Sequence, residues 1–408
     1  MPSPSTPARA VIAVAFVVLA ITKLPDVDGG LRYLLDADVY AIGGRRLLDG
    51  LPLYEGSFPT TEGTRLPFTY PPIAAVLFAP LAMIPLPAVF VLVTGLSIAA
   101  LWWVLKVVVG KLGGVRPADA AWYALALAAA LLWFGPVHTT LWYGQINVVL
   151  MMLVAIDVLV VPPRYRGLLT GAAIAIKLTP AVFGLWFLLR RDWAGIARIA
   201  AAAGGLTLLG HLIAPADSTR YWLDTLENTG RIGLPMYAAN QSIDAELWRL
   251  GLRTADGGSG LWLALVVLAF VVTVAVMLRL LRTGHPFLAA GANALFGLLA
   301  SPVSWSHHWV WVPVIIVAVA VLALRAPRPV PLAWVFVATG LLCFVIEPQG
   351  LAPAGDALEL GWSAASHIVG NLYLWWGVAA PVLLWFLATR LPTETPLSHR
   401  PRQKEHAR

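Results

Sequence analysis

The sequence predicts an all-α polytopic membrane protein, both from its composition and from the recurrence of its apolar runs. Of the 408 residues, 59% are apolar and only 12% are charged, and the mean hydropathy is +0.78. A water-soluble chain of this length keeps too little polar surface to cover so much apolar side-chain area. The composition therefore excludes a cytosolic enzyme, a nucleic-acid-binding protein and a disordered scaffold.

Apolar runs long enough to enter a bilayer follow one another along most of the chain. In order they cover residues 10–24, 72–84, 88–109, 118–134, 147–161, 168–189, 196–213, 261–280, 287–299, 310–324, 331–346 and 372–389. Prolines interrupt the second run, and Lys177 with Pro180 interrupts the sixth. A helix break at membrane depth is tolerated only where protein or a water-filled cavity satisfies the freed backbone groups. We therefore expect about 10–12 transmembrane or re-entrant segments.

Three longer hydrophilic segments separate these runs, at about residues 26–70, 215–260 and 347–370. The first carries seven acidic and four basic residues, the second six and four, and the third only acidic charges. Short basic connectors and the basic C-terminal tail contain Lys106, Lys111, Arg116, Arg164, Arg166, Arg190, Arg191, Arg198, Arg279, Arg282, Arg325, Arg328, Arg400, Arg402, Lys404 and Arg408. By the positive-inside rule these basic segments lie in the cytoplasm, and the three longer loops lie outside.

This charge pattern sets the expected organisation of the chain. The net charge of +7 marks cytoplasmic loops and contacts with anionic lipid headgroups rather than with nucleic acid. We expect one transmembrane domain over residues 1–390 and a basic cytoplasmic tail over 391–408, with both termini in the cytoplasm of a multi-pass plasma-membrane protein. Because basic residues flank both ends of the run 168–189, this run should enter the membrane and return as two half-helices, with Lys177 near the turn.

Two acidic residues near the start of the first outer loop are the first candidates for chemistry. Asp36 and Asp38 follow the first apolar run, and the stretch 39–48 has helical spacing, so it can lie flat on the membrane face. A carboxylate in this position can remove a proton from an attacking hydroxyl. The alternative is that these side chains cap a helix or are simply solvated.

Lys177 is the sharpest single anomaly, because it lies inside an apolar run. An ammonium group at the centre of a bilayer costs about 2.5–3.5 kcal/mol on insertion scales. It therefore needs an anion, a water-filled cavity or a route to the interface, and a lipid-linked phosphate is one such anion. The alternative is that the side chain extends to the interface. The helix break at Thr179 and Pro180 favours the functional reading.

A pair of adjacent histidines, His307 and His308, follows Trp305 at the outer end of an apolar helix pair, and Trp305 is itself a candidate for substrate binding. A histidine here can hydrogen-bond a phosphate or act as an acid or base, although a buried core histidine is the alternative. A metal site is not expected. Neighbouring residues on a helix point in different directions, no H-x-x-x-H spacing accompanies them, and the single cysteine, Cys343, lies in an apolar run.

Polar groups beside aromatic or apolar stretches give the remaining candidates. Tyr70 precedes a proline pair and can lie in an aromatic belt at the interface or face a substrate. Gln145 and Asn147 open an apolar helix, where amides either cap the helix or bind sugar hydroxyls. A dense polar cluster in the second outer loop is either an ordinary loop or a binding site: Asn240, Gln241 and Ser242.

Taken together, these segments resemble the polytopic GT-C glycosyltransferases, and specifically glycosyltransferase family 87. The resemblance covers nearly the whole chain and rests on six motifs in order. They are Asp36-x-x-Val39-Tyr40 with Gly50 and Tyr54, Phe68-x-Tyr70-Pro71-Pro72, Gly144-Gln145-x-Asn147, Ile176-Lys177-Leu178-Thr179-Pro180, Asn240-Gln241-Ser242 and Ser301-Pro302-x-Ser304-Trp305-x-His307-His308. Each motif is weak by itself, and the ordered set is specific.

The resemblance implies a GT-C fold with helical extracytoplasmic loops and an inverting mannosyltransferase of actinobacterial type. Such an enzyme takes mannose from a polyprenyl-phosphate mannose donor, and its glycolipid acceptor is a phosphatidylinositol mannoside or lipomannan at the outer face of the plasma membrane. The family pattern implies a catalytic carboxylate early in the first outer loop, which falls on Asp36 with Asp38 as the fallback. His308 or His307 would assist at the reacting centre, and Lys177 is our own inferred partner for the phosphate.

The chemistry of a lipid-linked donor agrees with this reading. Phosphate is already a competent leaving group, and a basic side chain can neutralise it, so we expect no metal cofactor. One displacement at the anomeric carbon would invert its configuration. The alternatives are a GT-C enzyme for another sugar or linkage, such as an arabinosyltransferase, and a transporter or flippase for a polyprenyl glycolipid. The large acidic loops and the missing inverted repeat argue against the transporter.

Overall fold

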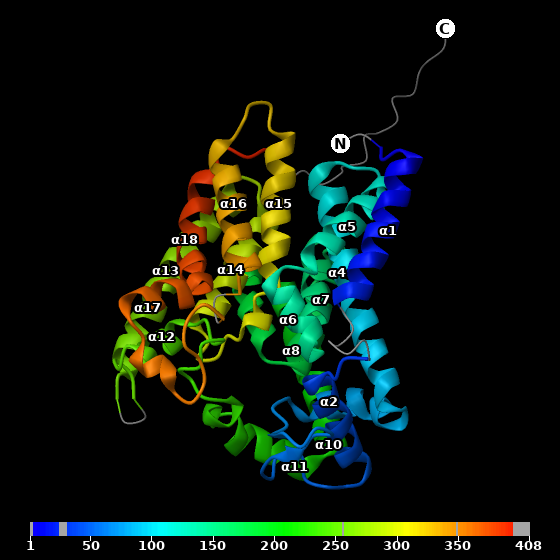
Figure 1. Ribbon diagram of the computed structural model, residues 1–408, viewed down its shortest axis with the longest axis vertical. Helices are drawn as coiled ribbons and strands as arrows, with labels where there is room; N and C mark the ends of the chain where they lie inside the picture. The colour runs from blue at the N-terminus through cyan, green and yellow to red at the C-terminus, as the bar shows by residue number, and fades with distance from the viewer. Residues whose placement is uncertain (1–2, 24–30, 255–256, 348–349, 395–408) are drawn as a thin grey trace.

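The computed structural model describes residues 3–23, 31–254, 257–347 and 350–394, and the expected all-α polytopic architecture is confirmed (Figure 1). The helices of the bundle are α1 (Thr6–Lys23), α4 (Leu86–Gly113), α5 (Pro117–Leu131), α7 (Asn147–Leu159), α10 (Trp193–Ile213), α13 (Ser259–Arg282), α14 (Pro286–Ala300), α15 (Trp311–Arg325), α16 (Pro331–Val345) and α18 (Leu372–Leu387). Two short strands, β1 (Phe58–Pro59) and β2 (Arg65–Leu66), pair antiparallel with Phe58 opposite Leu66.

Three of the described helices, α4, α10 and α13, are long and apolar enough to cross a membrane. Two further pairs pass the same test as bent units. α5 and α6 (Gly135–Tyr143) meet at 80°, and α17 (Ala364–Gly370) and α18 meet at 65°. The remaining apolar helices are shorter, with 10–17 residues. The sequence did not predict the sharp bend before α6, which brings the end of that helix to the start of α7.

Helix α15 forms the centre of the bundle. Nearly all of its side chains from Trp311 to Ala323 are buried, which is what a helix that is apolar on every face requires. It packs against α4, α14 and α16. On their outer faces, α4 and α16 expose large apolar side chains. The bundle therefore has an apolar core and an apolar exterior, as expected of a protein in lipid.

The basic connectors meet at one end of the bundle, called here the basic end. Lys111 Nζ donates to the Leu159 carbonyl over 2.6 Å and lies within electrostatic reach of Arg166. Arg325 donates to the Leu112 carbonyl, and Arg198 donates to the Arg166 carbonyl. The ends of α4, α7 and α15 thus lie together with the start of α10.

The acidic loops lie away from the basic end, at what is called here the acidic end; in Figure 1, α2 (Leu35–Leu48) and α11 (Pro215–Arg220) lie at the bottom, and α12 (Ile243–Arg249) and α17 lie at the left. The Leu53 amide donates to Asp217 over 2.8 Å, which ties the first loop to the second. The Ala238 amide donates to Glu359 over 3.1 Å, which ties the second loop to the third. Only residues 391–394 of the expected tail are described, and its basic residues lie outside the described part of the chain.

The run 168–189 enters the bundle and returns, as the sequence predicted. It consists of α8 (Leu168–Ile176), η2 (Thr179–Phe183) and α9 (Gly184–Leu189), with extended backbone at Lys177 between the two arms. Gly167, before the first arm, has φ +105°, and a side-chain carbon there would lie 2.3 Å from the Gly195 carbonyl oxygen. Phe187, near the end of the second arm, also contacts Gly195. Both ends of the run therefore meet the start of α10, and Lys177 lies at the tip.

An aromatic cluster seats α2 against α3 (Pro72–Phe78) at the acidic end. Tyr40 stacks on Phe78 with ring centroids 4.4 Å apart, and Tyr70 packs edge-on against Tyr40 at 5.3 Å. Gly44 lies so close to α3 that a side-chain carbon would come within 2.6 Å of the Phe78 carbonyl oxygen. This contact fixes α2, and with it the first turn that carries the acidic pair.

Candidate active site

The two acidic residues of the first turn of α2 have different surroundings. Asp38 is buried, and its carboxylate accepts hydrogen bonds from the Tyr33 hydroxyl at 2.7 Å and the Thr61 amide at 2.8 Å. It therefore holds its own loop together. Asp36 is only partly buried and lies near Gln145 and Lys177. Burial raises the pKa of the Asp36 carboxyl to about 6, against the opposing effects of the Gln145 hydrogen bond and the Lys177 charge.

Lys177 lies at the tip of the broken segment and faces three of the predicted residues. Its Nζ donates to Asn147 Oδ1 over 2.9 Å and lies 3.5 Å from His308 Nε2. It also lies over the Tyr70 ring, 5.4 Å from the centroid. No carboxylate is within ion-pair distance of Nζ among the described salt bridges. The ammonium is therefore held by neutral groups and can accept an anion.

Gln145 connects the acidic and basic sides of the site. Its Oε1 accepts from the hydroxyls of Tyr40 and Tyr70, at 3.3 and 3.2 Å, and these two hydroxyls lie 2.9 Å apart. With its oxygen used in this way, the amide nitrogen is left to donate to Asp36. Ile146 is the N-cap of α7 and no side chain caps that helix, so the capping alternative for Gln145 and Asn147 is wrong.

The two histidines form a short helical turn, η5 (Ser306–His308), with their rings edge-to-face at 4.8 Å. His307 is buried, and its carbonyl accepts from Asn147 at 3.0 Å and Thr140 at 3.2 Å. His308 is partly exposed beside Lys177. Burial and the Lys177 charge hold the pKa of His308 well below its usual value. Its imidazole is therefore neutral at neutral pH.

The polar cluster of the second outer loop holds the histidine segment rather than facing the site. The Asn240 side chain donates to the Pro302 carbonyl over 3.0 Å and accepts from the Ser304 amide at 2.8 Å. Its backbone forms an isolated antiparallel β-bridge with Trp305. Ser242 caps α12 by accepting from the Ala245 amide at 3.1 Å. Gln241 donates to the carbonyls of Ala238 and Gly370. All three members of the predicted cluster are fully buried: Asn240, Gln241 and Ser242.

Arg249 reinforces this loop, and the sequence analysis missed it. The side chain is fully buried and pairs with Glu246 at 3.1 Å. It also donates to the carbonyls of Tyr237 and Asn240, at 3.2 and 3.0 Å. Tyr40 was also missed as a site residue, although its spacing of four from Asp36 places both on one face of a helix.

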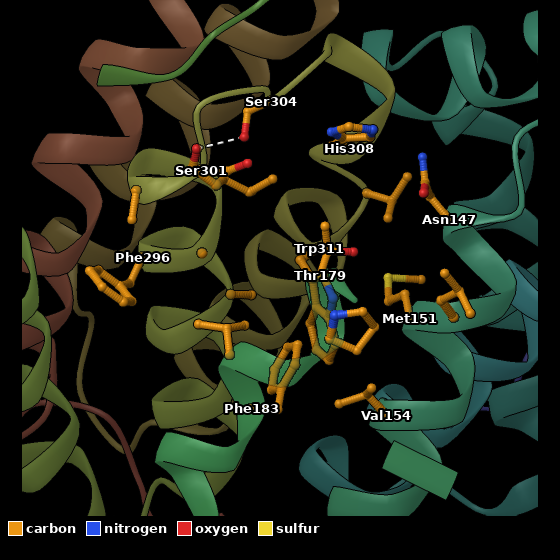
Figure 2. Close-up of a pocket in the computed structure, with 18 of the residues that line it drawn as sticks. Asn147, Met151, Val154, Thr179, Phe183, Phe296, Ser301, Ser304, His308 and Trp311 are labelled. Carbon is orange, nitrogen blue, oxygen red and sulfur yellow. Dashed lines mark hydrogen bonds between the residues drawn. The ribbon is translucent and has the colours of Figure 1, made fainter. Parts of the chain in front are cut away.

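An apolar cavity of about 320 Å³ lies beside the ammonium group, between α7, η2, α14 and α15 (Figure 2). Figure 2 shows His308 and Asn147 at one end of this cavity and Phe183 and Val154 at the other. Two of its polar lining residues, Asn147 and His308, also contact Lys177. The cavity therefore combines polar groups near Lys177 with a mostly apolar lining.

The site brings together Asp36, Tyr70, Gln145, Asn147, Lys177 and His308, from segments that are far apart in the sequence. His307 lies behind His308, and Asp38, Asn240, Gln241 and Ser242 are bonded within the protein. Across the described ranges, no group of three or more His, Cys, Asp and Glu side chains could hold a metal ion.

Comparison with known proteins shows the family of the chain. The profile of glycosyltransferase family 87 matches residues 68–302. A polyprenol-phosphate-mannose-dependent alpha-(1-2)-phosphatidylinositol mannoside mannosyltransferase of Mycobacterium tuberculosis is 40% identical over 376 residues, which is 88% of this chain and 86% of that protein. The protein of the same description from Mycolicibacterium smegmatis is 41% identical over 385 residues, with the same coverage of both chains.

Among solved structures, ArnT from Cupriavidus metallidurans bound to undecaprenyl phosphate is similar with a TM-score of 0.42 and 13% identity, over 95% of this chain and 78% of that chain. The family profile covers more than half of the sequence, and the mycobacterial relatives match over most of its length. The chain therefore belongs to glycosyltransferase family 87 and is a glycosyltransferase.

Proposed function

We propose that this protein transfers mannose from polyprenyl-phosphate mannose to a hydroxyl of a phosphatidylinositol mannoside or lipomannan, and forms an α-(1→2) linkage. The names of the two mycobacterial relatives give polyprenol-phosphate mannose as their donor and phosphatidylinositol mannoside as their acceptor. The observation that carries the proposal is the geometry of the site. The Asp36 carboxyl is within electrostatic reach of the Lys177 ammonium, and the two residues that contact this ammonium, Asn147 and His308, line an apolar cavity.

The donor binds with its phosphate at Lys177 and its isoprenoid chain in the apolar cavity. Lys177 Nζ has a neutral partner in Asn147 and faces the neutral imidazole of His308, so a phosphate oxygen can join this group without displacing an ion pair. The cavity side chains beyond His308 and Asn147 are mostly apolar, and they suit an isoprenoid. A donor held in lipid reaches such a site without leaving the membrane.

The transfer is a single displacement at the anomeric carbon of mannose. Asp36 takes the proton of the acceptor hydroxyl as the hydroxyl oxygen forms its bond to C1. The C1–O bond to phosphate breaks, the electron pair stays on the phosphate, and polyprenyl phosphate is released. Attack from the side opposite the leaving group converts a β-linked donor into an α-linked product. Lys177 stabilises the charge on the departing phosphate, and His308, with Nε2 3.5 Å from Lys177 Nζ, helps to position the ammonium.

We propose that the transfer of mannose requires no metal ion. The donor carries a single phosphate, and the positive charge of Lys177 neutralises it where a nucleotide-sugar enzyme would need a divalent cation. Chelation provides a direct check. Transfer measured with excess EDTA is expected to equal transfer with added Mg²⁺ or Mn²⁺, and a loss of activity that either metal restores would contradict this part of the proposal.

We further propose that the acidic end faces the outside of the plasma membrane, since the basic end carries the connectors that the positive-inside rule assigns to the cytoplasm. In a Cys343→Ala background, a cysteine at Leu223, which is 78% exposed on the acidic end, should react with a membrane-impermeant maleimide in intact cells. A cysteine at Arg328, on the basic end, should react only after lysis. The reverse pattern would overturn the orientation.

The reaction is tested with purified protein in detergent, radiolabelled polyprenyl-phosphate mannose and a phosphatidylinositol mannoside acceptor. We expect a labelled glycolipid one mannose longer, which an α-(1→2)-mannosidase shortens again. Transfer from polyprenyl-phosphate arabinose instead would establish the arabinosyltransferase alternative. Movement of the donor across a vesicle membrane with no new glycosidic bond would establish the transporter alternative.

A further inference from the structure

A second group of polar and aromatic side chains lies next to the site and has no part in the transfer described above. It consists of Tyr143, His138, Glu347, Tyr237 and Trp305, and it is called here the acceptor surface. These residues come from α6, from the segment after α16, from the second outer loop and from the histidine segment. The fold thus brings four separate segments together at this surface.

Tyr143 joins this surface to the reacting centre. Its ring packs edge-on against His307 with centroids 5.6 Å apart, and its hydroxyl is within electrostatic reach of Asp36. The same hydroxyl is within reach of Tyr237 and Glu347. A molecule that presents a hydroxyl to Asp36 and extends past Tyr143 therefore meets the remaining members of the surface.

The outer members of the surface are accessible. His138 Nδ1 and Glu347 Oε1 pair at 2.9 Å, with 27% and 33% of their side chains exposed. Tyr237 is 41% exposed and packs edge-on against Trp305 at 6.0 Å. The surface therefore offers aromatic faces, a carboxylate, an imidazole and a phenol to a ligand.

This set of groups suits a sugar ring better than a lipid chain or a phosphate. The C–H face of a hexose packs against an aromatic ring, and its hydroxyls both donate and accept hydrogen bonds. A carboxylate accepts strongly from neighbouring hydroxyls, and a histidine or tyrosine serves the others. A phosphate would instead be repelled by Glu347.

We propose that the acceptor surface binds the mannose unit of the acceptor glycan that adjoins the unit receiving the new sugar. This inference rests on the proposed function and adds a requirement for acceptor length. A glycan of several mannose units occupies both Asp36 and the surface, whereas a single mannoside occupies Asp36 alone.

The test compares two synthetic acceptors, octyl α-mannoside and octyl α-(1→6)-mannotrioside, with the purified full-length protein and polyprenyl-phosphate mannose. Glu347→Gln removes the charge at constant shape, and Tyr143→Phe removes only the hydroxyl. Each is expected to raise KM for the trioside about tenfold, the effect of losing one strong hydrogen bond. We expect kcat, the KM for the donor and the KM for octyl mannoside to stay within twofold.

Glu55→Gln is the matched control, because Glu55 is also a glutamate of the acidic loops that forms an ion pair, here with Arg220 at 2.8 Å, and it is no member of the acceptor surface. It is expected to leave both acceptors unaffected. An unchanged KM for the trioside in both test variants would overturn the inference, and the acceptor surface would then be an interfacial aromatic belt. An equal rise for both acceptors would also overturn it. If the parent protein transfers no mannose to either acceptor, the proposed function itself fails.

Discussion

The pH dependence of transfer should report the ionisation of Asp36, because a general base must be deprotonated to work. With a pKa of about 6, Asp36 is about one-tenth ionised at pH 5 and about nine-tenths ionised at pH 7. We therefore expect kcat/KM to be full at neutral pH and to fall about tenfold per unit on the acid side of the midpoint. The donor carries a phosphodiester, which does not titrate in this range.

Replacing Gln145 should move this midpoint in a known direction. The amide hydrogen bond favours the charged carboxylate, so the Gln145→Met substitution raises the pKa of Asp36. A hydrogen bond to a charged group contributes about 1.5–3 kcal/mol, which corresponds to about 1–2 pKa units. The midpoint of the acid limb should therefore move from about 6 to about 7–8. The Tyr40 and Tyr70 hydroxyls still bond each other in this variant.

The assay is the initial rate of mannose transfer at low donor concentration between pH 5 and 9, at constant ionic strength. Glu55→Gln serves again as the control, with the profile of the parent protein expected. An acid limb at the same pH in the parent and in Gln145→Met would refute the assignment of the limb to Asp36. A shift toward lower pH would refute the sign of the argument.

Three further predictions follow from the same contacts. Asp36→Asn should raise the free energy of unfolding in detergent by about 1–3 kcal/mol at pH 7.5 and leave it nearly unchanged at pH 3, because a carboxyl whose pKa is raised from 3.8 to about 6 on folding costs stability as the pH rises between these two values; an equal effect of the substitution at both pH values would contradict this. Lys177→Met should raise the donor KM more than tenfold and leave the acceptor KM unchanged, while equal effects on both would point to general damage. Arg249→Met should lower the free energy of unfolding by about 3–5 kcal/mol, because it leaves Glu246 buried with less compensation; Arg45→Met, at an exposed site, is the control.

The sequence predicted most of what depends on local pattern. The run 168–189 was expected to break and return because basic residues flank both of its ends, and the structure confirms this with Lys177 at the tip. The same logic placed Asp36, Lys177 and the histidine pair on one side of the membrane, and the structure brings Asp36, Lys177 and His308 together. Hydropathy and charge predict where the chain enters and leaves the membrane because lipid tolerates few backbone structures other than helices.

The sequence could not separate residues whose difference lies in distant neighbours. Asp36 and Asp38 are two positions apart, and only the contacts of Asp38 with Tyr33 and Thr61 distinguish them. The polar cluster at Asn240 has the composition of a binding site, yet its groups are used by backbone atoms of the loop before His307. The bend before α6, which creates the acceptor surface, also has no signal in hydropathy.

The most direct test of the account is the rate of mannose transfer by Asp36→Asn, measured together with the binding of polyprenyl-phosphate mannose to the same protein. Asparagine keeps the shape of the side chain and removes its basicity, so the account predicts a rate lower by about 10²–10⁴ with donor affinity within threefold of the parent. Parent-like transfer by a well-folded Asp36→Asn protein would show that some other group takes the acceptor proton.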